Sequence, residues 1–137
     1  MFDGLQPRRD SRRALPEPGL FLYRPSVYGK TPELMGRGLK GLLVVDEPTP
    51  LDADADLLMA LDDWRLDAQG QFVGDFGAPE AARGEGRIGT RLIVNGAAAP
   101  VVQEARPGAR VRLRLANLAN ARLMMLTFDG VQPYVIA

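Results

Sequence analysis

Glycine and proline interrupt this sequence so often that long helices have little room. The chain holds 15 glycines and 11 prolines among 137 residues. The longest apolar runs between them are short, at 42–45 and 57–61. Glycine and proline disfavour helix interiors and mark turns, whereas short apolar runs bounded by them are typical of strands. The sequence therefore predicts an all-β fold of many short strands.

The first half of the chain predicts two strands around one helical turn. Residues 1–18 carry little apolar periodicity and are expected to be irregular and mobile. Residues 19–23 predict one strand, and 38–46 a second that is apolar on both faces, as in a strand covered from two sides. Between them, Thr31 and Pro32 favour a helical turn over 31–35, with Thr31 as its N-cap.

Pro48 and Pro50 predict a boundary, because proline cannot donate to a β ladder and stiffens a linker. We therefore expect two units, 1–48 and 49–137. In the second unit, strands are predicted at 56–62 and 91–96, the latter ending in an Asn-Gly turn, with a mobile loop over 68–87. Residues 123–128 and 131–136 predict a hairpin closed by Asp-Gly.

Residues 110–115 alternate strictly between arginine and apolar side chains. The period predicts a strand with Val111, Leu113 and Leu115 on the core face. Arg110, Arg112 and Arg114 then lie on the other face, where we expect solvated arginines; an anion-binding stripe is the alternative.

The sequence contains no histidine and no cysteine. This absence excludes disulfides, zinc fingers, a cysteine nucleophile, a Ser-His-Asp triad and a blue-copper site built from these residues. The formal net charge is zero, so the chain as a whole has no field that would attract nucleic acid or an anionic membrane. No apolar run approaches a membrane span, and these residues contain no secretory signal.

Four groups of residues have spacings that suggest a chemical function, but we prefer a structural role for each of them. Asp52, Asp54 and Asp56 have calcium-loop spacing, but leucine stands where that loop needs glycine. Asp62 and Asp63 are adjacent on a strand and should point to opposite faces, which disfavours an acid/base pair. Gly84-Glu85-Gly86 lacks the continuation of a phosphate-binding loop. Ser26 with Lys30 is a hydrolase hypothesis that requires the two side chains to meet.

Residues 19–48 resemble the end of a plastocyanin-like (cupredoxin) domain of the multicopper oxidases, where Gly-x-x-x-Tyr-His-x-His leads through a loop to a Gly-rich apolar strand. The two histidines are copper ligands in that family. Tyr23 matches the tyrosine, whereas Arg24 and Ser26 stand at the histidine positions, and Tyr28 lies where some members carry another histidine. Guanidinium has no acceptor and a serine hydroxyl is a poor copper ligand, so we expect no copper here.

Later segments resemble the start of the second cupredoxin domain of the same family. They are Asp-Asp-Trp at 62–64, Leu-Ile-Val-Asn-Gly at 92–96, Arg-Pro-Gly-x-Arg-Val-Arg-Leu-Arg-Leu-Ala-Asn at 106–117 and Ala-Asn-Ala-Arg at 119–122. The resemblance implies a cupredoxin-like Greek-key β-sandwich. That sandwich is expected to be incomplete, because the first unit contributes two strands and the second about five of the usual seven.

The resemblance implies a parent protein of laccase type, which oxidises phenols or metal ions and reduces dioxygen to water with copper. We expect this chain to be a fragment or degenerate member of that family, with no copper ligands, no catalytic residues and no cofactor of its own. The alternative is a noncatalytic β-sandwich interaction or structural module. The expected partner is the remainder of the parent protein or a second copy, and the resemblance suggests a periplasmic or secreted parent.

Overall fold

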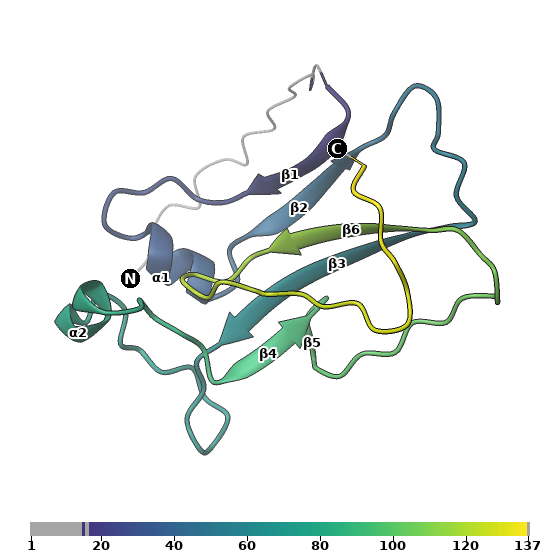
Figure 1. Cartoon of the computed structure of the whole chain (residues 1–137). Helices are drawn as coiled ribbons and strands as arrows, with labels where there is room; N and C mark the ends of the chain where they lie inside the picture. The colour runs from purple at the N-terminus through teal and green to yellow at the C-terminus, as the bar shows by residue number, and fades with distance from the viewer. Residues whose placement is uncertain (1–14, 16, 137) are drawn as a thin grey trace.

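The computed structural model describes residues 15 and 17–136, so most of the predicted irregular segment 1–18 lies outside the described residues. Its elements, in chain order, are β1 (Gly19–Tyr23), α1 (Thr31–Gly36), β2 (Gly41–Val45), β3 (Ala55–Trp64), α2 (Pro79–Arg83), β4 (Arg91–Val94), β5 (Ala97–Ala98) and β6 (Val111–Asn117). Strands dominate and form two sheets (Figure 1). The predicted all-β class is therefore confirmed. Among the described residues, no helix is long and apolar enough to cross a membrane.

The smaller sheet consists of β1 and β2, which pair antiparallel from Gly19 opposite Val45 to Tyr23 opposite Gly41. The one-turn helix α1 lies in the connection between them, as predicted. Its N-cap is Lys30 rather than Thr31, and Lys30 makes no side-chain capping bond. The Thr31 hydroxyl instead donates to the carbonyls of Pro25 and Val27 and accepts from the Val27 amide, which fixes the loop before the helix.

The larger sheet has the strand order β5-β4-β3-β6, with β3 and β6 parallel and the other pairs antiparallel. The predicted Asn-Gly turn joins β4 to β5. Asn95 and Gly96 both have positive φ, 51° and 80°, as a type I′ hairpin turn requires. The Asn95 side chain also accepts from the amide of Ala60 and donates to the carbonyl of Leu58, so the turn is fastened to β3.

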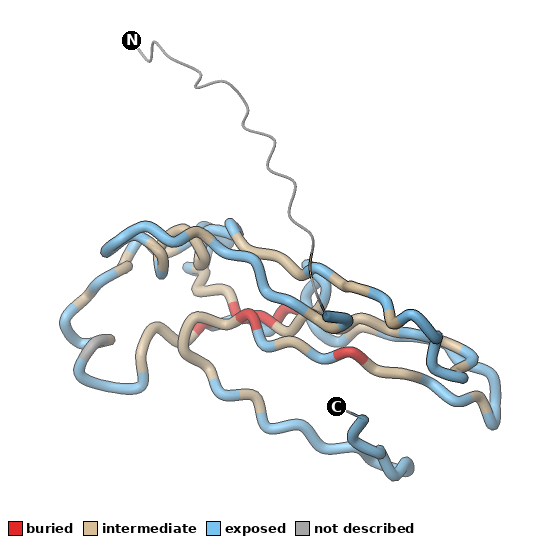
Figure 2. The backbone as a smooth tube through the Cα atoms, turned by 90° about the horizontal axis from the view of Figure 1, so that it is seen from above, coloured by how far each residue is buried: buried red, intermediate tan, exposed pale blue. Residues whose placement is uncertain are grey.

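The molecule is layered (Figure 2). The small sheet lies over one side of the four-stranded sheet, and the segment after β6 runs along the other side. The buried residues, red in Figure 2, lie in and beside the four-stranded sheet. Among the described residues these include two apolar side chains, Ile93 and Leu118, and three charged ones, Asp62, Asp63 and Arg114. The centre of the fold is thus unusually polar.

The predicted hairpin of 123–128 and 131–136 is wrong, because the described residues after β6 form no strand. Several apolar side chains in this segment are almost fully exposed, including Leu123 and Met125 at 93% and Val135 at 96%. A two-stranded hairpin is marginal unless a further layer covers its apolar face. No such layer lies over this segment within the described residues (Figure 2).

Candidate functional site

The loop that follows β1 carries the three residues at which the family resemblance would place metal ligands. Arg24, Ser26 and Tyr28 are all exposed. Lys30 forms its ion pair with Glu33 at 3.3 Å, and none of the described side-chain hydrogen bonds joins it to Ser26. The structure therefore does not assemble the serine–lysine pair that a hydrolase would need.

Copper does not fit the donor atoms of this loop. A guanidinium is a permanent cation with five donors and no lone pair to give, and the serine and tyrosine hydroxyls are weak ligands when neutral. The sequence has no imidazole or thiolate to offer in their place. Within the described residues, no group of three carboxylate side chains is arranged to hold a metal ion.

The three aspartates of the calcium-like spacing are each bound by an arginine of the β6 region. Asp52 pairs with the side chain of Arg110 at 2.6 Å, and Asp54 accepts from the backbone amide of Arg110 at 2.7 Å. Asp56 makes a forked pair with Arg114. Two of the aspartates thus bind arginine side chains and the third binds a backbone amide, which agrees with the structural interpretation.

The alternation of β6 has the predicted period, but the burial of its two faces is the reverse of the prediction. Val111 and Leu115, expected on the core face, are 39% and 37% exposed, and the expected solvated arginines are wrong as well. Arg114 and Arg112 keep only 8% and 16% of their side-chain surface exposed. They lie under the segment that follows β2, where Glu47 accepts from both nitrogens of the Arg112 fork. Only Arg110, 66% exposed, is solvated. The anion-binding alternative fails as well, since carboxylates already neutralise both inner arginines.

Register shows which side chains share each face of the large sheet. Asp56 is paired with Arg112 and Leu58 with Arg114, so these four lie on the side of the small sheet. We call this side the charged face. The opposite side, the apolar face, is formed by the alternate residues Leu57, Met59, Leu61, Leu92, Val94, Val111, Leu113 and Leu115. Asp63 also belongs to it.

Glu47 is the central acid of the charged face. The hydrogen bonds from Arg112 lower the pKa of its carboxyl from 4.5 to about 2, with backbone hydrogen bonding and the charge of Arg114 acting in the same direction. The same contacts raise the pKa of Arg112, and Asp56 raises that of Arg114. Glu47, Arg112 and Arg114 are therefore charged at neutral pH, and their contacts hold the segment after β2 against β6.

A buried ion pair makes the second connection between the two sheets. Lys40 lies just before β2 with 5% of its side chain exposed, and its ammonium group contacts Asp62 Oδ1 and the carbonyl of Leu118, both at 2.7 Å. Asp62 Oδ2 accepts from the indole of Trp64 at 3.1 Å. Sequence patterns did not reveal this role of Lys40, because its partner follows 22 residues later.

Asp63 lies on the other side of β3, as the strand period predicts, and its side chain is 1% exposed. One oxygen accepts from Arg122 Nε at 3.0 Å and from the amide of Gly89, while the other has no hydrogen-bond partner. Arg122 also donates to the carbonyl of Gly89. Asp62 and Asp63 thus serve two separate structural ion pairs, and the structure gives them no shared substrate position.

The glycine-rich segment 68–87 is more firmly attached than its composition suggests. Arg87 donates to Asp75 and to the carbonyl of Val73, and its guanidinium lies 4.0 Å from the ring centre of Phe76. Phe76 also contacts Gly36 at the end of α1. Gly84-Glu85-Gly86 follows α2 instead of preceding a helix, so it does not form a phosphate cradle.

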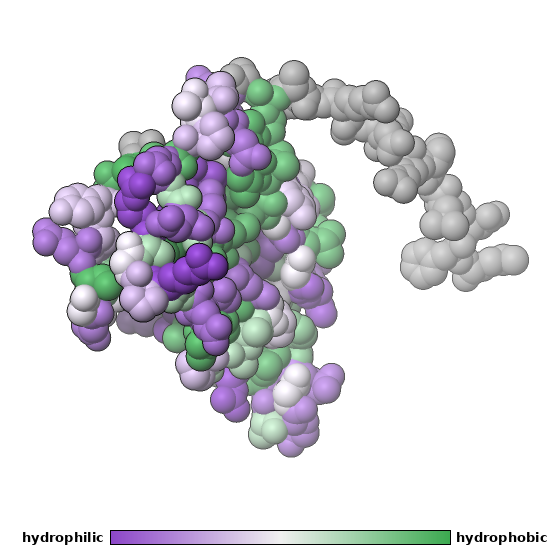
Figure 3. Space-filling model, turned by 90° about the vertical axis from the view of Figure 1, so that its right-hand side faces the viewer, coloured by the Kyte–Doolittle hydropathy of each residue, from purple (hydrophilic) through white to green (hydrophobic). Residues whose placement is uncertain are grey.

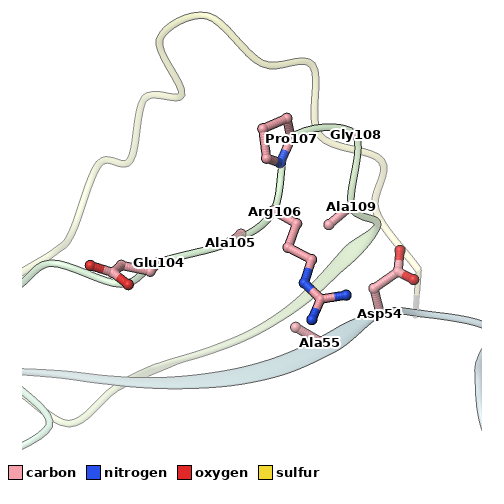
Figure 4. A pocket seen from close by; sticks show the side chains of 8 residues that line it. All are labelled: Asp54, Ala55, Glu104, Ala105, Arg106, Pro107, Gly108 and Ala109. Carbon is pink, nitrogen blue, oxygen red and sulfur yellow. The ribbon is translucent and has the colours of Figure 1, made fainter.

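An open groove of about 560 Å³ lies between the start of β3 and the 104–109 segment (Figure 4). Arg106 extends from that segment towards Ala55, and Glu104 lies further along it. Among the described residues, neither Arg106 nor Glu104 forms an ion pair or a side-chain hydrogen bond.

The fold is similar to that of solved multicopper oxidases. The structure aligns with an enzyme of that name from Pseudomonas thermotolerans over 77% of the chain, with a TM-score of 0.68 and 36% identity. This chain is a relative of the multicopper oxidases. McoA multicopper oxidase from Aquifex aeolicus, as its 2F4 variant, aligns over 77% of the chain, with a TM-score of 0.60 and 25% identity. These alignments cover 25% and 23% of the two oxidases.

The curated proteins that this chain matches are named as cell division proteins and not as oxidases. Cell division protein FtsP of Yersinia pestis is 36% identical over 118 residues, which cover 80% of this chain and 24% of that protein. FtsP of Salmonella typhimurium is 30% identical over 118 residues, covering 84% of this chain and 25% of that protein. The chain therefore spans about a quarter of the length of the curated relatives it matches. No family model matches the chain.

Proposed function

We propose that this chain is a copper-free structural part of a larger multicopper-oxidase-like protein. In this proposal, 1–48 belong to a first cupredoxin-like unit and 49–137 to a second, and the charged face joins the two. Arg24 and Ser26, at the positions where the family resemblance expects histidine ligands, carry the proposal. Neither residue can replace a neutral imidazole.

The open apolar face supports the larger size of the parent protein. Val111 and Leu115 on that face are 39% and 37% exposed, and Leu92 is 50% exposed. Apolar surface, green in Figure 3, is accordingly visible along one side of the molecule. In a sandwich this face packs on a second sheet about 10 Å away. We propose that the remainder of the parent protein supplies that sheet, with 123–136 as one of its strands.

The total solvent-accessible surface of the chain also supports a larger parent protein. A folded chain of 14.9 kDa exposes about 7,000 Å², whereas this chain exposes 11560 Å². Suppose that the 16 residues outside the described part are counted as unfolded chain and the remainder as a smaller folded protein. The surface of the chain would still exceed the expected surface by about 2,600 Å². A stable interface covers about 800 Å² on each partner. The excess is therefore large enough for an extensive permanent contact.

For the parent protein as a whole, we propose a role in cell division without oxidase chemistry. The name that the curated relatives share supports a role in cell division. The replacement of the expected histidine ligands by Arg24 and Ser26 supports the loss of copper. A copper oxidase whose metal is held entirely by residues outside this chain is the second candidate. The likeness to solved multicopper oxidases favours it.

Metal analysis of the natural full-length protein separates the two candidates. After incubation with copper and gel filtration, the proposal predicts less than one copper per ten molecules and no oxidation of phenols. Deletion of the gene should delay or block cell separation, and the wild-type protein should restore it. Stoichiometric copper with phenol oxidation would refute the copper-free role and establish the second candidate.

A further inference from the structure

The turn between β4 and β5 places an asparagine side chain next to an unhindered glycine amide. Asn95 and Gly96 are both exposed to solvent. The space around Gly96 is open, since a Cβ on this residue would have no neighbour within 4 Å. Within the described residues, the Gly96 amide donates no hydrogen bond to another backbone group. The nitrogen of Gly96 is therefore accessible to base and to water.

Such a pair can react without an enzyme. After base removes the proton of the Gly96 amide, the nitrogen attacks Cγ of Asn95 and closes a five-membered succinimide ring, and Nδ2 leaves as ammonia with that proton. Water then opens the ring. Cleavage of the bond from nitrogen to Cγ gives aspartate, and cleavage of the bond from nitrogen to the main-chain carbonyl carbon gives isoaspartate. Glycine favours the attack, because it has no Cβ that shields the nitrogen and its backbone rotates freely.

The conformation of the turn keeps the two groups apart while the protein is folded. The first central residue of a type I′ turn has a ψ of about 30°, the mirror image of type I. Asn95 occupies that position with a φ of 51°. At this ψ its Cβ lies nearly opposite the Gly96 nitrogen across the Cα–C bond, whereas ring closure requires both atoms on the same side. The reaction therefore requires the turn to open.

Two side-chain hydrogen bonds to β3 oppose this opening. Oδ1 of Asn95 accepts from the amide of Ala60 at 2.8 Å, and Nδ2 donates to the carbonyl of Leu58 at 2.7 Å. Both bonds break when the side chain turns towards Gly96. A hydrogen bond of ordinary net strength shifts an equilibrium about fivefold, so the two together should slow the reaction about 25-fold.

We propose that Asn95 is a site of spontaneous deamidation whose rate is set by the opening of the β4–β5 turn from β3. The reacted turn cannot close again in the same way. Aspartate has a carboxylate oxygen where Nδ2 donated to the carbonyl of Leu58, so two acceptors meet there. Isoaspartate adds one carbon atom to the main chain of a two-residue turn. Each reaction thus releases the turn from β3 permanently. The inference goes beyond the proposed structural role and depends neither on copper nor on cell division.

Mass spectrometry of the natural full-length protein tests the inference. The folded protein and a synthetic peptide with the sequence of 92–110 are incubated side by side at mildly alkaline pH. Trypsin releases the same segment from the protein, and fragmentation locates the change from amide to carboxyl at Asn95. We expect the folded protein to react about 25-fold more slowly than the peptide. Hydrogen exchange of the Ala60 amide, which donates to Asn95, measures the opening of the turn in the same sample.

Protein variants connect the reaction to the opening. Ile93→Val removes one buried methylene from β4, which should speed both Ala60 exchange and Asn95 deamidation about fivefold. Ile88→Val removes the same group outside β4 and should change both rates less than twofold. Asn95→Asp, which mimics one product, should exchange the Ala60 amide as fast as the deamidated protein. Deamidation of the folded protein at the rate of the peptide would overturn the inference. So would an Asn95 rate in Ile93→Val that does not rise with Ala60 exchange.

Discussion

Replacing Lys40 with methionine should open the large sheet locally. The change keeps most of the side-chain shape but removes the ammonium that contacts Asp62 and the carbonyl of Leu118. Removing one partner of a buried ion pair usually costs about 3–5 kcal/mol, because the other charge stays buried. Asp62 keeps the Trp64 indole and the Asp63 amide as donors. We therefore expect the low end, about 3 kcal/mol.

Hydrogen–deuterium exchange of β3 measures this loss in the full-length protein. Since 1.4 kcal/mol corresponds to a factor of ten, the amides of 60–64 should exchange about a hundredfold faster in Lys40→Met. Adding Asp62→Asn should restore most of the protection, because a neutral pair leaves no buried charge. Arg110→Met removes an equal charge from an exposed pair and should change exchange less than threefold. Unchanged exchange in Lys40→Met would refute the structural role of this pair.

Three further changes test other contacts. A carboxyl with a lowered pKa in the folded state stabilises the fold above its unfolded pKa and loses that contribution as pH falls; for Glu47 the window runs from 4.5 down to about 2. Glu47→Gln should therefore flatten the fall in stability across this window, and an unchanged pH profile would contradict the Arg112 contact. Gly89→Ala should cost about 2 kcal/mol or more, because a Cβ would lie 2.6 Å from the Asp63 carbonyl carbon. Gly74→Ala, with open space around it, is the matched control in thermal unfolding, and equal effects would refute the close approach. Asn95→Ala loses two hydrogen bonds to β3 and keeps a strained φ of 51°, so it should cost about 2 kcal/mol. Asn95→Gly removes only the hydrogen bonds and should cost less in the same assay.

Local sequence signals predicted the elements that local chemistry determines. The strand 19–23 and the Asn-Gly turn after β4 follow from apolar runs and from residues that tolerate positive φ. The strict alternation of β6 also gave the correct period. These features need no knowledge of distant residues, because each depends on side chains within a few positions of one another.

Contacts between distant segments could not be predicted in this way. Arg112 and Arg114 looked solvated because Glu47, which covers them, lies 65 residues before Arg112. Lys40 gave no signal for the same reason. The hairpin over 123–136 was predicted from good local patterns, but a strand also needs a neighbour, and the described chain supplies none.

The intact mass of the natural translation product tests the central claim most directly. If the remainder of a larger multicopper-oxidase-like protein covers the open apolar face, the mass must be well above the 14.9 kDa of these 137 residues. A natural product of 14.9 kDa that stays monomeric and folded would contradict the account, because no second sheet would then pack on that face.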